Sequence, residues 1–505
     1  MNHWIIAPVV LPALLAPFMM LTMRRDLMLQ RVFGLAGTLA LLGIAAGLLV
    51  SATGTPADVY FLGNWPAPFG IVLVLDRLSA LMLGLTAVLA LAVQLYAIST
   101  DWDTRGRHFH VLLLFQLMGL NGAFLTGDAF NLFVFFEVLL IASYGLMIHG
   151  GGRDRLRAGV QYIAFNLVGS TLFLFALATV YSVTGTLNFA DLAVKVANLP
   201  EGDAALIRVA GVLLLLVFAI KGALVPLHFW LPNTYAFAPG PVAALFAVMT
   251  KVGAYATIRI YTLVFPTGTP ATGTLFAEIL QPAALITLGV GVLGVLGAQT
   301  LGRLVAFAAI ASMGTLFIAI AAFTPQALAA GLYYLIHSTL AGGALFLICD
   351  MVSDRRADDR LTRALPPIPQ HGLIGALFLA GAIAAAGMPP LSGFLGKLLI
   401  LDATRGPGMA LVWSVILATS LISIVGFARA GSTLFWKAHE SAPQARPVHK
   451  AEPLSFAAVF GLLAALLALT VFAGPVTGWL EVTAAGLFDP AAYIDANTLP
   501  TGGTP

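Results

Sequence analysis

The sequence predicts an all-α polytopic membrane protein with about 14 transmembrane helices, ten of which form two inverted five-helix repeats that contain broken helices. Three observations predict this fold: an apolar composition, a series of apolar runs of spanning length, and a weak internal repeat. Of the 505 residues, 60% are hydrophobic and only 9% are charged, whereas soluble domains carry roughly 25% charged residues. Such a chain cannot hide its apolar surface from water, so we expect it in a bilayer.

The predicted spans are the apolar runs that lie between glycine, proline and charged breaks, since a span needs about 20 residues. They cover residues 3–22, 31–51, 71–99, 108–126, 128–149, 158–184, 206–225, 241–263, 276–297, 302–322, 327–352, 371–402, 409–436 and 454–478. We therefore divide the chain into N-terminal helices (1–107), a first repeat (108–263), a second repeat (276–436), a final span (454–478) and a flexible tail (479–505) that is rich in Gly, Pro and Thr.

Basic residues are distributed unequally between the two sets of loops. Cytoplasmic loops collect Lys and Arg, and the loops after spans 1, 3, 5, 9, 11 and 13 hold 16 of the 25: Arg24, Arg25, Arg31, Arg105, Arg107, Arg153, Arg155, Arg157, Arg303, Arg355, Arg356, Arg360, Arg363, Lys437, Arg446 and Lys450. The opposite side holds Lys195, Arg208, Arg259 and Arg405. Both termini are therefore predicted to lie on the non-cytoplasmic side.

The internal repeat relates span 6 to span 11 and span 5 to span 10. AGVQYIAFNLVGS, which starts at Ala158, resembles AGLYYLIHSTLAG, which starts at Ala330; IASYG at Ile141 resembles IASMG at Ile310. The shift is five spans, an odd number, so the two copies enter the membrane from opposite sides, as in many transporter folds. Chance similarity between small and apolar residues is the alternative.

Among the charged residues inside predicted spans, four are assigned to mid-membrane: Glu137, Lys221, Lys251 and Lys397. Each costs about 2.5–3.5 kcal/mol at mid-membrane, so together they rival the whole stability of a typical fold, about 5–15 kcal/mol. They must be paired or hydrated inside the bundle. Lys221 is the obvious partner for Glu137, and such a pair can act as a switch, because on separation the lysine can lose a proton and the glutamate can gain one. A static ion pair is the alternative.

Helix-breaking residues accompany two of the buried lysines. Proline has no N–H, so it frees a helical carbonyl, and a freed carbonyl is tolerated at membrane depth only where protein or water satisfies it. Breaks beside Lys221 and Lys397, in the fourth span of each repeat, favour a polar path over purely structural kinks. The predicted helix breaks are at Pro226, Pro232, Pro389 and Pro390.

Histidines and hydroxyl side chains provide further candidates for proton transfer. His337 lies among Ser, Thr and Gly in YYLIHSTLAGG and titrates in a suitable range, although a satisfied core histidine is the alternative. The possible relay or hydrating residues are His228, Ser143, Thr250, Ser338 and Ser392. Asp76, Arg77 and Arg429 are interpreted mainly as structural pairs or interface groups.

Other classes of protein are excluded or unsupported. The net charge of +3 is small and scattered, so nucleic-acid binding is not expected. The single Cys349 excludes a disulfide scaffold, a cysteine zinc site and a cysteine-ligated iron–sulfur cluster. No phosphate loop, HExxH motif or nucleophile elbow occurs in a suitable context. We therefore expect no cofactor, no metal site and no enzymatic centre.

Four stretches closely resemble the antiporter-like membrane subunits shared by Mrp-type multisubunit cation/proton antiporters, respiratory complex I and membrane-bound hydrogenases: FFEVLLIASYGLM, IKGALVPLHFWLPNTYAFAPGPVAALFAVMTKVGAYATIR, YYLIHSTLAGGALF and GMPPLSGFLGK. The resemblance covers most of spans 3 to 13 and implies fourteen helices with two inverted repeats. It also implies that the proton-transfer residues of the family correspond to Glu137, Lys221, Lys251, His337 and Lys397.

Within this family the chain is most similar to the Mrp-type members. Lys397 stands where the M-type subunit of complex I has a glutamate, and the chain ends soon after span 14, without the long lateral helix of the L-type subunit. The N-type subunit also has a lysine at this position, so a subunit of complex I or a hydrogenase remains the alternative. A scaffold that only holds partner subunits is a third interpretation.

The resemblance implies a mechanism and partners. Protons would move along the lysines and His337 near the bilayer midplane, gated by Glu137 and Lys221. Na⁺, Li⁺ or K⁺ would move in the opposite direction, along a path shared with the other subunits of a hetero-oligomeric complex in a bacterial cytoplasmic (inner) membrane. The sequence has no carboxylate cage of its own for a cation.

Overall fold

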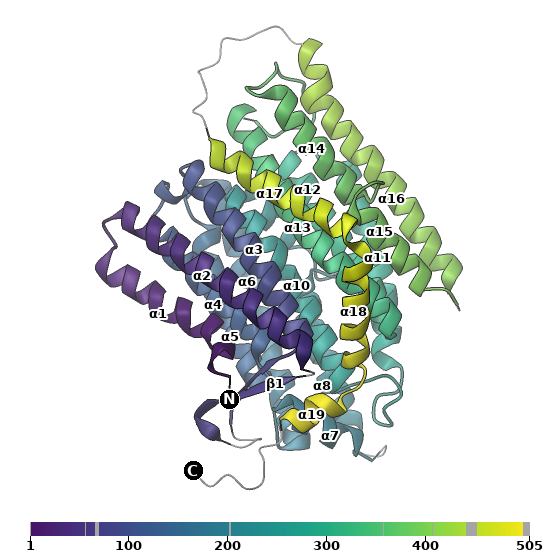
Figure 1. Cartoon of the computed structure of the whole chain (residues 1–505). Coiled ribbons are helices and arrows are strands. Elements are labelled where there is room, and N and C mark those ends of the chain that lie inside the picture. The colour runs from purple at the N-terminus through teal and green to yellow at the C-terminus, as the bar shows by residue number, and fades with distance from the viewer. Residues whose placement is uncertain are drawn as a thin grey trace.

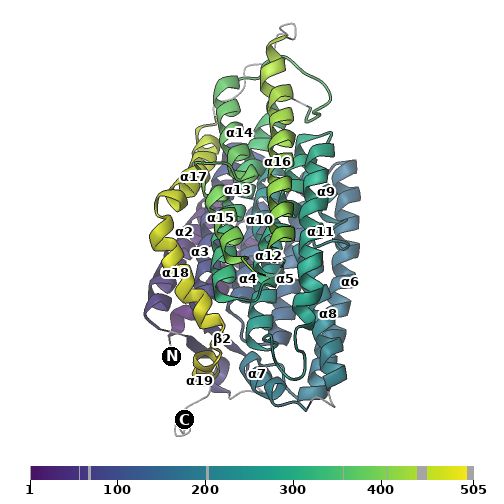
Figure 2. The same ribbon diagram turned by 90° about the vertical axis from the view of Figure 1, so that its right-hand side faces the viewer.

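A computed structural model describes residues 2–55, 57–65, 70–200, 204–356, 358–406, 408–440 and 452–497. These residues form a bundle of long helices that run along roughly one direction (Figures 1 and 2). The helices are α1 (Ala7–Thr22), α2 (Leu27–Gly54), α3 (Arg77–Ser99), α4 (Phe109–Leu125), α5 (Ala129–Met147), α6 (Arg153–Thr184), α7 (Phe189–Ala197), α8 (Ala204–Gly222), α9 (Leu231–Phe237), α10 (Gly240–Leu263), α11 (Leu275–Gly297), α12 (Leu301–Ala321), α13 (Pro325–Arg356), α14 (His371–Ala386), α15 (Ser392–Ala403), α16 (Met409–Gly431), α17 (Pro453–Val471), α18 (Ala473–Leu487) and α19 (Ala491–Ala496). Strands β1 (Asp58–Phe61) and β2 (Val72–Leu75) form an antiparallel ribbon.

The predicted all-α membrane fold is confirmed. Within the described residues, 11 helices are long and apolar enough to cross a membrane. The predicted spans 1, 4 and 12 correspond to three shorter apolar helices: α1, α4 and α14. The exact number of fourteen spans is therefore not confirmed by helix length and composition, because these three helices have 16, 17 and 16 residues.

Acidic side chains begin several of the spanning helices. Asp26 accepts a hydrogen bond from Leu29 N–H (3.0 Å) at the start of α2, and Asp128 accepts one from Asn131 N–H (2.8 Å) at the start of α5. Asp76 forms a reciprocal capping box with Ser79 at the start of α3. These carboxylates satisfy N–H groups that have no partner within their own helix, which fixes where each helix begins.

Matching helix contacts occur in the two predicted repeats. α4 packs on α5 as α11 packs on α12, and α6 packs on α8 as α13 packs on α14 and α15. In both units the fourth span consists of two helices, α8 with α9 and α14 with α15. The chain order of these contacts agrees with two five-helix units.

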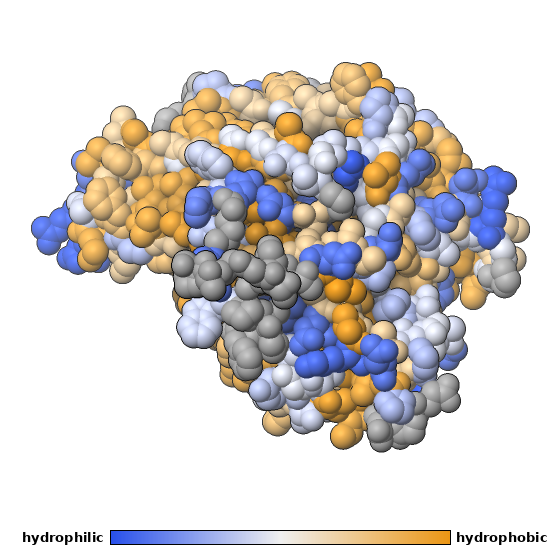
Figure 3. Space-filling model, turned by 60° about the horizontal axis from the view of Figure 1, so that its bottom comes forward, coloured by the Kyte–Doolittle hydropathy of each residue, from blue (hydrophilic) through white to orange (hydrophobic). Residues whose placement is uncertain are grey.

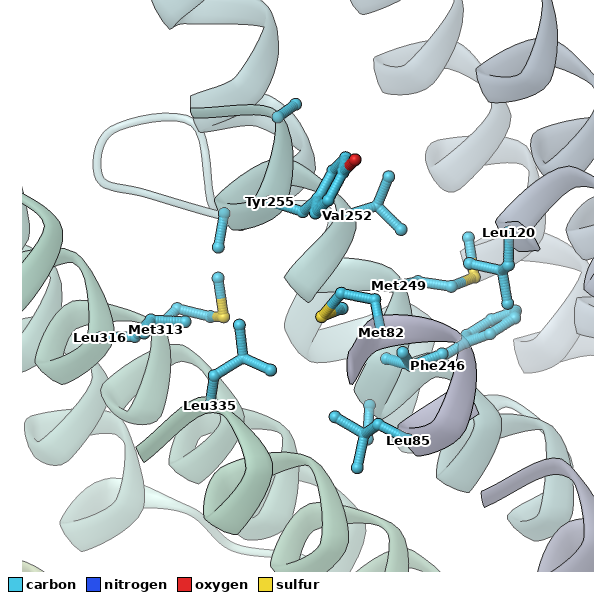
Figure 4. Close-up of a cluster of buried hydrophobic side chains, with 14 of the residues drawn as sticks. Met82, Leu85, Leu120, Phe246, Met249, Val252, Tyr255, Met313, Leu316 and Leu335 are labelled. Carbon is cyan, nitrogen blue, oxygen red and sulfur yellow. The ribbon is translucent and has the colours of Figure 1, made fainter. Parts of the chain in front are cut away.

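Helix α10 forms the centre of the bundle, and all of its residues are buried. Figure 4 shows α10 residues Phe246, Met249 and Val252 among apolar side chains from four neighbouring helices. Those neighbours include Met82 and Leu85 of α3, Leu120 of α4, Met313 and Leu316 of α12, and Leu335 of α13. An ionisable side chain on α10 is therefore surrounded by protein rather than by lipid.

The basic loops meet at one end of the bundle. Arg31 in the second turn of α2 pairs with Asp103 (2.6 Å), and Arg105 pairs with Asp354 at the end of α13 (3.7 Å), so the segment after α3 is joined to both helices. Arg446 and Lys450 lie outside the described residues. The N-terminus lies at the opposite end, where β1, α7 and α19 are also found (Figure 1).

The prediction of a flexible tail after residue 479 was wrong for the described part of that segment. Helix α18 continues to Leu487, α19 follows, and the described residues end at Asn497. The physical reason is a distant contact: Tyr493 of α19 is buried, and its ring lies 5.3 Å from the guanidinium of Arg259 in α10. The predicted final span at 454–478 likewise consists of parts of two helices, because α17 ends at Val471.

Helices α11 and α12 touch through glycine, and this contact predicts a mutational effect. A Cβ on Gly291 would overlap the backbone nitrogen of Ala311. We expect Gly291→Ala to destabilise the fold by about 1–3 kcal/mol, the usual cost of overpacking, measured as a lower thermal midpoint of the purified protein. Gly289→Ala on the same helix is the control, because its Cβ would meet nothing within 4 Å. Equal midpoints for the two variants would contradict the packing argument.

Candidate functional site

Helix α6 connects two charged residues of the first repeat, Glu137 and Lys221. The Lys221 ammonium donates a hydrogen bond to Asn166 Oδ1 (2.8 Å), and the Ser170 hydroxyl donates one to the Glu137 carboxylate. Asn166 and Ser170 are four residues apart and therefore lie on one face of α6. Among the described residues, no ion pair within 4 Å joins Glu137 to Lys221 directly, so the link between them runs through α6.

Lys221 lies at the broken end of α8. Only 7% of the residue is exposed, and its Nζ lies 5.6 Å from the centre of the Phe136 ring. The helix ends one residue later, at Gly222, and a helix C-terminus favours a cation because its last carbonyls have no helical partner. The end of α8 thus supplies a negative electrostatic environment for this ammonium.

Protein groups satisfy the backbone at this break. The indole of Trp230 donates to the Ile220 carbonyl (3.0 Å), and Val225 N–H donates to the Thr287 hydroxyl of α11 (2.9 Å). Pro226 lies in the non-helical segment between α8 and α9. Pro232, which was also predicted to break a helix, instead lies in the first turn of α9. A first-turn N–H has no helical acceptor, so Pro232 fits the start of a helix.

Lys251 is the most deeply buried of the three lysines, with 1% of the residue exposed. In the described part of the chain, its ammonium makes no hydrogen bond or ion pair. Gly253, two residues further along α10, lies against the break in α8: a Cβ there would come within 2.7 Å of Gly222 N and 3.0 Å of Lys221 Cβ. The backbone of α10 thus touches α8 where Lys221 lies.

His337 of α13 contacts the first turn of α15. Its Nδ1 lies 2.9 Å from the hydroxyl of Ser392, the first residue of α15. A Cβ on Gly393 would lie 2.8 Å from His337 Nε2, so only glycine leaves room for the imidazole there. His337 is 2% exposed. The broken span of the second repeat therefore positions this histidine.

Lys397 of α15 donates a hydrogen bond to a backbone carbonyl at the second helix break. Its ammonium donates to the carbonyl of Ala386, the last residue of α14, and to the Ser420 hydroxyl of α16, each at 2.9 Å. Pro389 and Pro390 lie in the segment between α14 and α15. The helix break thus supplies an oxygen that solvates a buried cation.

The weaker candidates are mostly occupied by local hydrogen bonds. Ser143 bonds to the Leu140 carbonyl (2.7 Å) and to the Tyr162 hydroxyl (2.8 Å); Thr250 and Ser338 donate to carbonyls of their own helices. His228, in the break after α8, differs because its buried Nδ1 has no hydrogen-bond partner among the described residues. His228 is thus the member of this group with free hydrogen-bonding capacity.

Sequence reasoning missed Asn166, Ser170 and Ser420. A signal for the first two existed, because both lie in the repeated stretch AGVQYIAFNLVGS at a spacing of one helical turn. Ser420 carried no comparable signal, since a serine in an apolar helix commonly bonds to its own backbone, and Ser420 also donates to Ile416 O (2.7 Å).

The stretch of this chain that matches a known family includes all of these site residues. Residues 126–423 match a family described as NADH:quinone oxidoreductase/Mrp antiporter, TM. The chain is 39% identical to the D-type subunit of a probable K⁺/H⁺ antiporter from Rhizobium meliloti (strain 1021), over 98% of this chain and 97% of the relative. It is 38% identical to the D-type subunit of a Na⁺/H⁺ antiporter from Bacillus subtilis (strain 168), over 98% and 99%.

Solved structures agree with these relatives. A chain of the Mrp complex from Dietzia sp. DQ12-45-1b superposes with a TM-score of 0.89 at 29% identity, covering 98% of this chain and 100% of that one. A chain of respiratory complex I from Thermus thermophilus gives a TM-score of 0.79 at 26% identity, covering 96% and 99%.

The hydrogen bond between Lys221 and Asn166 can be tested by a double-mutant cycle. We expect Asn166→Leu to lower the stability by about 1.5–3 kcal/mol, because a buried charged donor loses its acceptor. In a Lys221→Met background the same change should have much less effect. Thermal midpoints of the four purified proteins measure the coupling, and Asn198→Leu at an exposed helix end is the control. Additive effects would show that the bond contributes nothing.

Proposed function

Because this chain belongs to the NADH:quinone oxidoreductase/Mrp antiporter family of transmembrane proteins, we propose that it is the proton-translocating D-type subunit of a multisubunit antiporter. The antiporter exchanges a monovalent cation, Na⁺, Li⁺ or K⁺, for protons. D-type subunits of Na⁺/H⁺ and K⁺/H⁺ antiporters match it from end to end. The chain is accordingly a transporter subunit rather than an enzyme, and its partners are the other subunits of an Mrp-type complex.

The observation that carries the proposal is the placement of buried ionisable side chains at broken helices. Lys221 lies at the end of α8, His337 contacts the start of α15, and Lys397 joins α14 to α15. Lys251 lies on the fully buried α10, the last helix of the first repeat, which packs against α13 of the second. Fixed charges at this depth are costly, and a static scaffold has no need of four ionisable groups beside interrupted helices.

Proton transfer follows from repulsion between neighbouring cations. Two ammonium groups in a low-dielectric interior repel strongly, so a proton that arrives on Lys221 favours release of a proton from the next residue of the chain. The proposed order is Lys221, Lys251, His337 and Lys397. His337 can accept at one ring nitrogen and donate at the other. Ordered waters would join groups that are not in direct contact.

Glu137 and Lys221 form the proposed gate. Asn166 stabilises the charged lysine by accepting a hydrogen bond from it, and Ser170 stabilises the charged glutamate by donating one to it. A shift of the broken end of α8 would change the distance between the two charges while α6 stays in place. As that distance alternates, Lys221 would gain and lose its proton.

The proposed location is a bacterial cytoplasmic (inner) membrane, with both termini on the non-cytoplasmic side. This orientation follows from the excess of basic residues in one set of loops. We propose that the path of the exchanged cation is shared with neighbouring subunits of the complex.

Substitutions of the gate in the assembled complex test this function. We expect Glu137→Ala and Lys221→Ala each to reduce cation-driven collapse of a pH gradient in everted vesicles at least tenfold, because the proton chain loses its first members. Lys195→Ala is the control, since Lys195 forms a partly exposed i,i+4 pair with Asp191. Full activity of either gate variant at normal complex abundance would refute the gating role. Co-purification with iron–sulfur or flavin subunits would instead favour a redox-driven pump.

A further inference from the structure

Helix α10 carries two polar side chains that the proposed proton chain does not use, Tyr255 and Arg259. They follow Lys251 at intervals of four residues, so all three lie along one face of the helix. The rise of 1.5 Å per residue places Arg259 about 12 Å from Lys251 along the axis, towards the end of the bundle where α19 lies. All three residues are buried. A polar column therefore leads from Lys251 towards that end.

Asp76 binds Arg259, the residue of this column that lies farthest from Lys251. Two guanidinium nitrogens of Arg259 donate to the two carboxylate oxygens of Asp76, at 2.5 and 2.9 Å. The Arg259 and Asp76 side chains are 3% and 10% exposed. The Tyr255 hydroxyl receives a long bond from Arg259 (3.4 Å) and donates to the Phe124 carbonyl (2.6 Å). Arg259 is thus fixed by Asp76 and Tyr255.

Asp76 is a permanent counter-ion rather than a proton carrier. Two hydrogen bonds from Arg259 and one from the Ser79 backbone N–H stabilise the ionised form of its carboxyl. A carboxyl of this kind stays ionised at neutral pH. Sequence reasoning did not pair Asp76 with Arg259, because the two residues are far apart in the chain.

A cavity of about 380 Å³ lies outside the ion pair. Its polar lining includes Thr53, Asp76, Arg77, Arg259, Thr262 and Tyr493, and Asp489 also contributes. Two buried polar atoms of this lining, Arg259 Nε and Tyr493 Oη, have no hydrogen-bond partner among the described residues. Such atoms are normally satisfied by water. Figure 3 shows this end of the molecule, where hydrophilic side chains interrupt the apolar surface.

We propose that this cavity is an aqueous vestibule for protons and monovalent cations, and that Arg259 is the specificity-determining residue that separates it from Lys251. The inference rests on the proposed antiport function and adds the access site on the side of the termini. The Arg259 guanidinium lies between the vestibule and Lys251 along α10, and a fixed guanidinium repels cations, including hydrated protons, on the side away from its carboxylate partner. Asp76 holds that charge in place and lines the vestibule. Antiport needs such a barrier, because an open path to Lys251 would let protons leak without exchange.

A proton-leak measurement tests the barrier. The whole complex, reconstituted in proteoliposomes, is given a pH gradient in choline medium free of Na⁺, Li⁺ and K⁺, and a trapped pH dye follows its collapse. We expect the double variant Asp76→Asn/Arg259→Gln, which removes both charges while keeping similar shapes, to leak about tenfold faster than the unmodified complex. Arg259→Lys keeps the positive charge and should stay within about twofold of it.

The control is a second buried ion pair, between Arg355 and Glu452 (3.2 Å), at the opposite end of the bundle. Arg355→Gln/Glu452→Gln should not increase the leak, because this pair lies outside the column. A purely structural role for Arg259 predicts that loss of either pair lowers stability without a leak. A leak equal to that of the unmodified complex in the assembled Asp76→Asn/Arg259→Gln variant would overturn the proposal.

Cysteine labelling tests the vestibule without altering the ion pair. In a Cys349→Ser background, Thr262→Cys lines the cavity, whereas Thr250→Cys lies on the Lys251 side of Arg259. We expect a membrane-impermeant cationic thiol reagent to modify position 262 from the side of the termini and to leave position 250 unmodified. Absence of reaction at position 262, or equal reaction at both positions, would overturn the inference.

The same vesicles separate this inference from the proposed function. Addition of Na⁺ or K⁺ to the unmodified complex measures antiport. If no cation drives proton movement, the antiport assignment fails, while the leak and labelling results still decide whether Arg259 closes a water-filled vestibule.

Discussion

Burial of positive charge inside an apolar bundle is the constraint on which the rest of this structure depends. Water cannot solvate an ammonium at this depth, so the protein must supply oxygen atoms. An unbroken helix has none to offer, because its carbonyls bond within the helix. Interrupting α8 and α14 frees carbonyls, and the lysines lie beside those ends. The helix breaks therefore supply backbone oxygen atoms beside two buried lysines, Lys221 and Lys397.

The two repeats satisfy their lysines in different ways. In the second repeat, Lys397 takes a carbonyl freed by the break and the hydroxyl of Ser420. In the first repeat, the indole of Trp230 occupies the Ile220 carbonyl near the break, and Lys221 uses the amide of Asn166 instead. An amide on α6 also brings the lysine into contact with the helix that holds Glu137 through Ser170. The lysine of the first repeat is thereby linked to a carboxylate through α6, and the proposed gate depends on this link.

Features of the fold and the site that depend on short segments could be predicted from the sequence, whereas those that depend on packing between helices could not. The spans, the buried lysines and the break at Pro226 follow from residue hydrophobicity, the cost of buried charge and the missing proline N–H, all of which are properties of short segments. Partners that depend on packing between helices were missed, as Asn166 and Ser420 illustrate. The tail was misjudged because its composition is typical of loose segments, whereas the buried ring of Tyr493 against Arg259 fixes it.

Close backbone contact joins the two halves of the site mechanically. Gly253 of α10 leaves no space for a Cβ beside Gly222 and Lys221 of α8, so the end of α8 cannot move towards α10 without displacing it. Interiors packed at this density transmit such displacements rather than absorbing them. A movement of Lys221 towards α10 therefore displaces that helix, which carries both Lys251 and Arg259. One fully buried helix thus connects the proposed gate at Glu137 and Lys221 to the proposed barrier at Arg259.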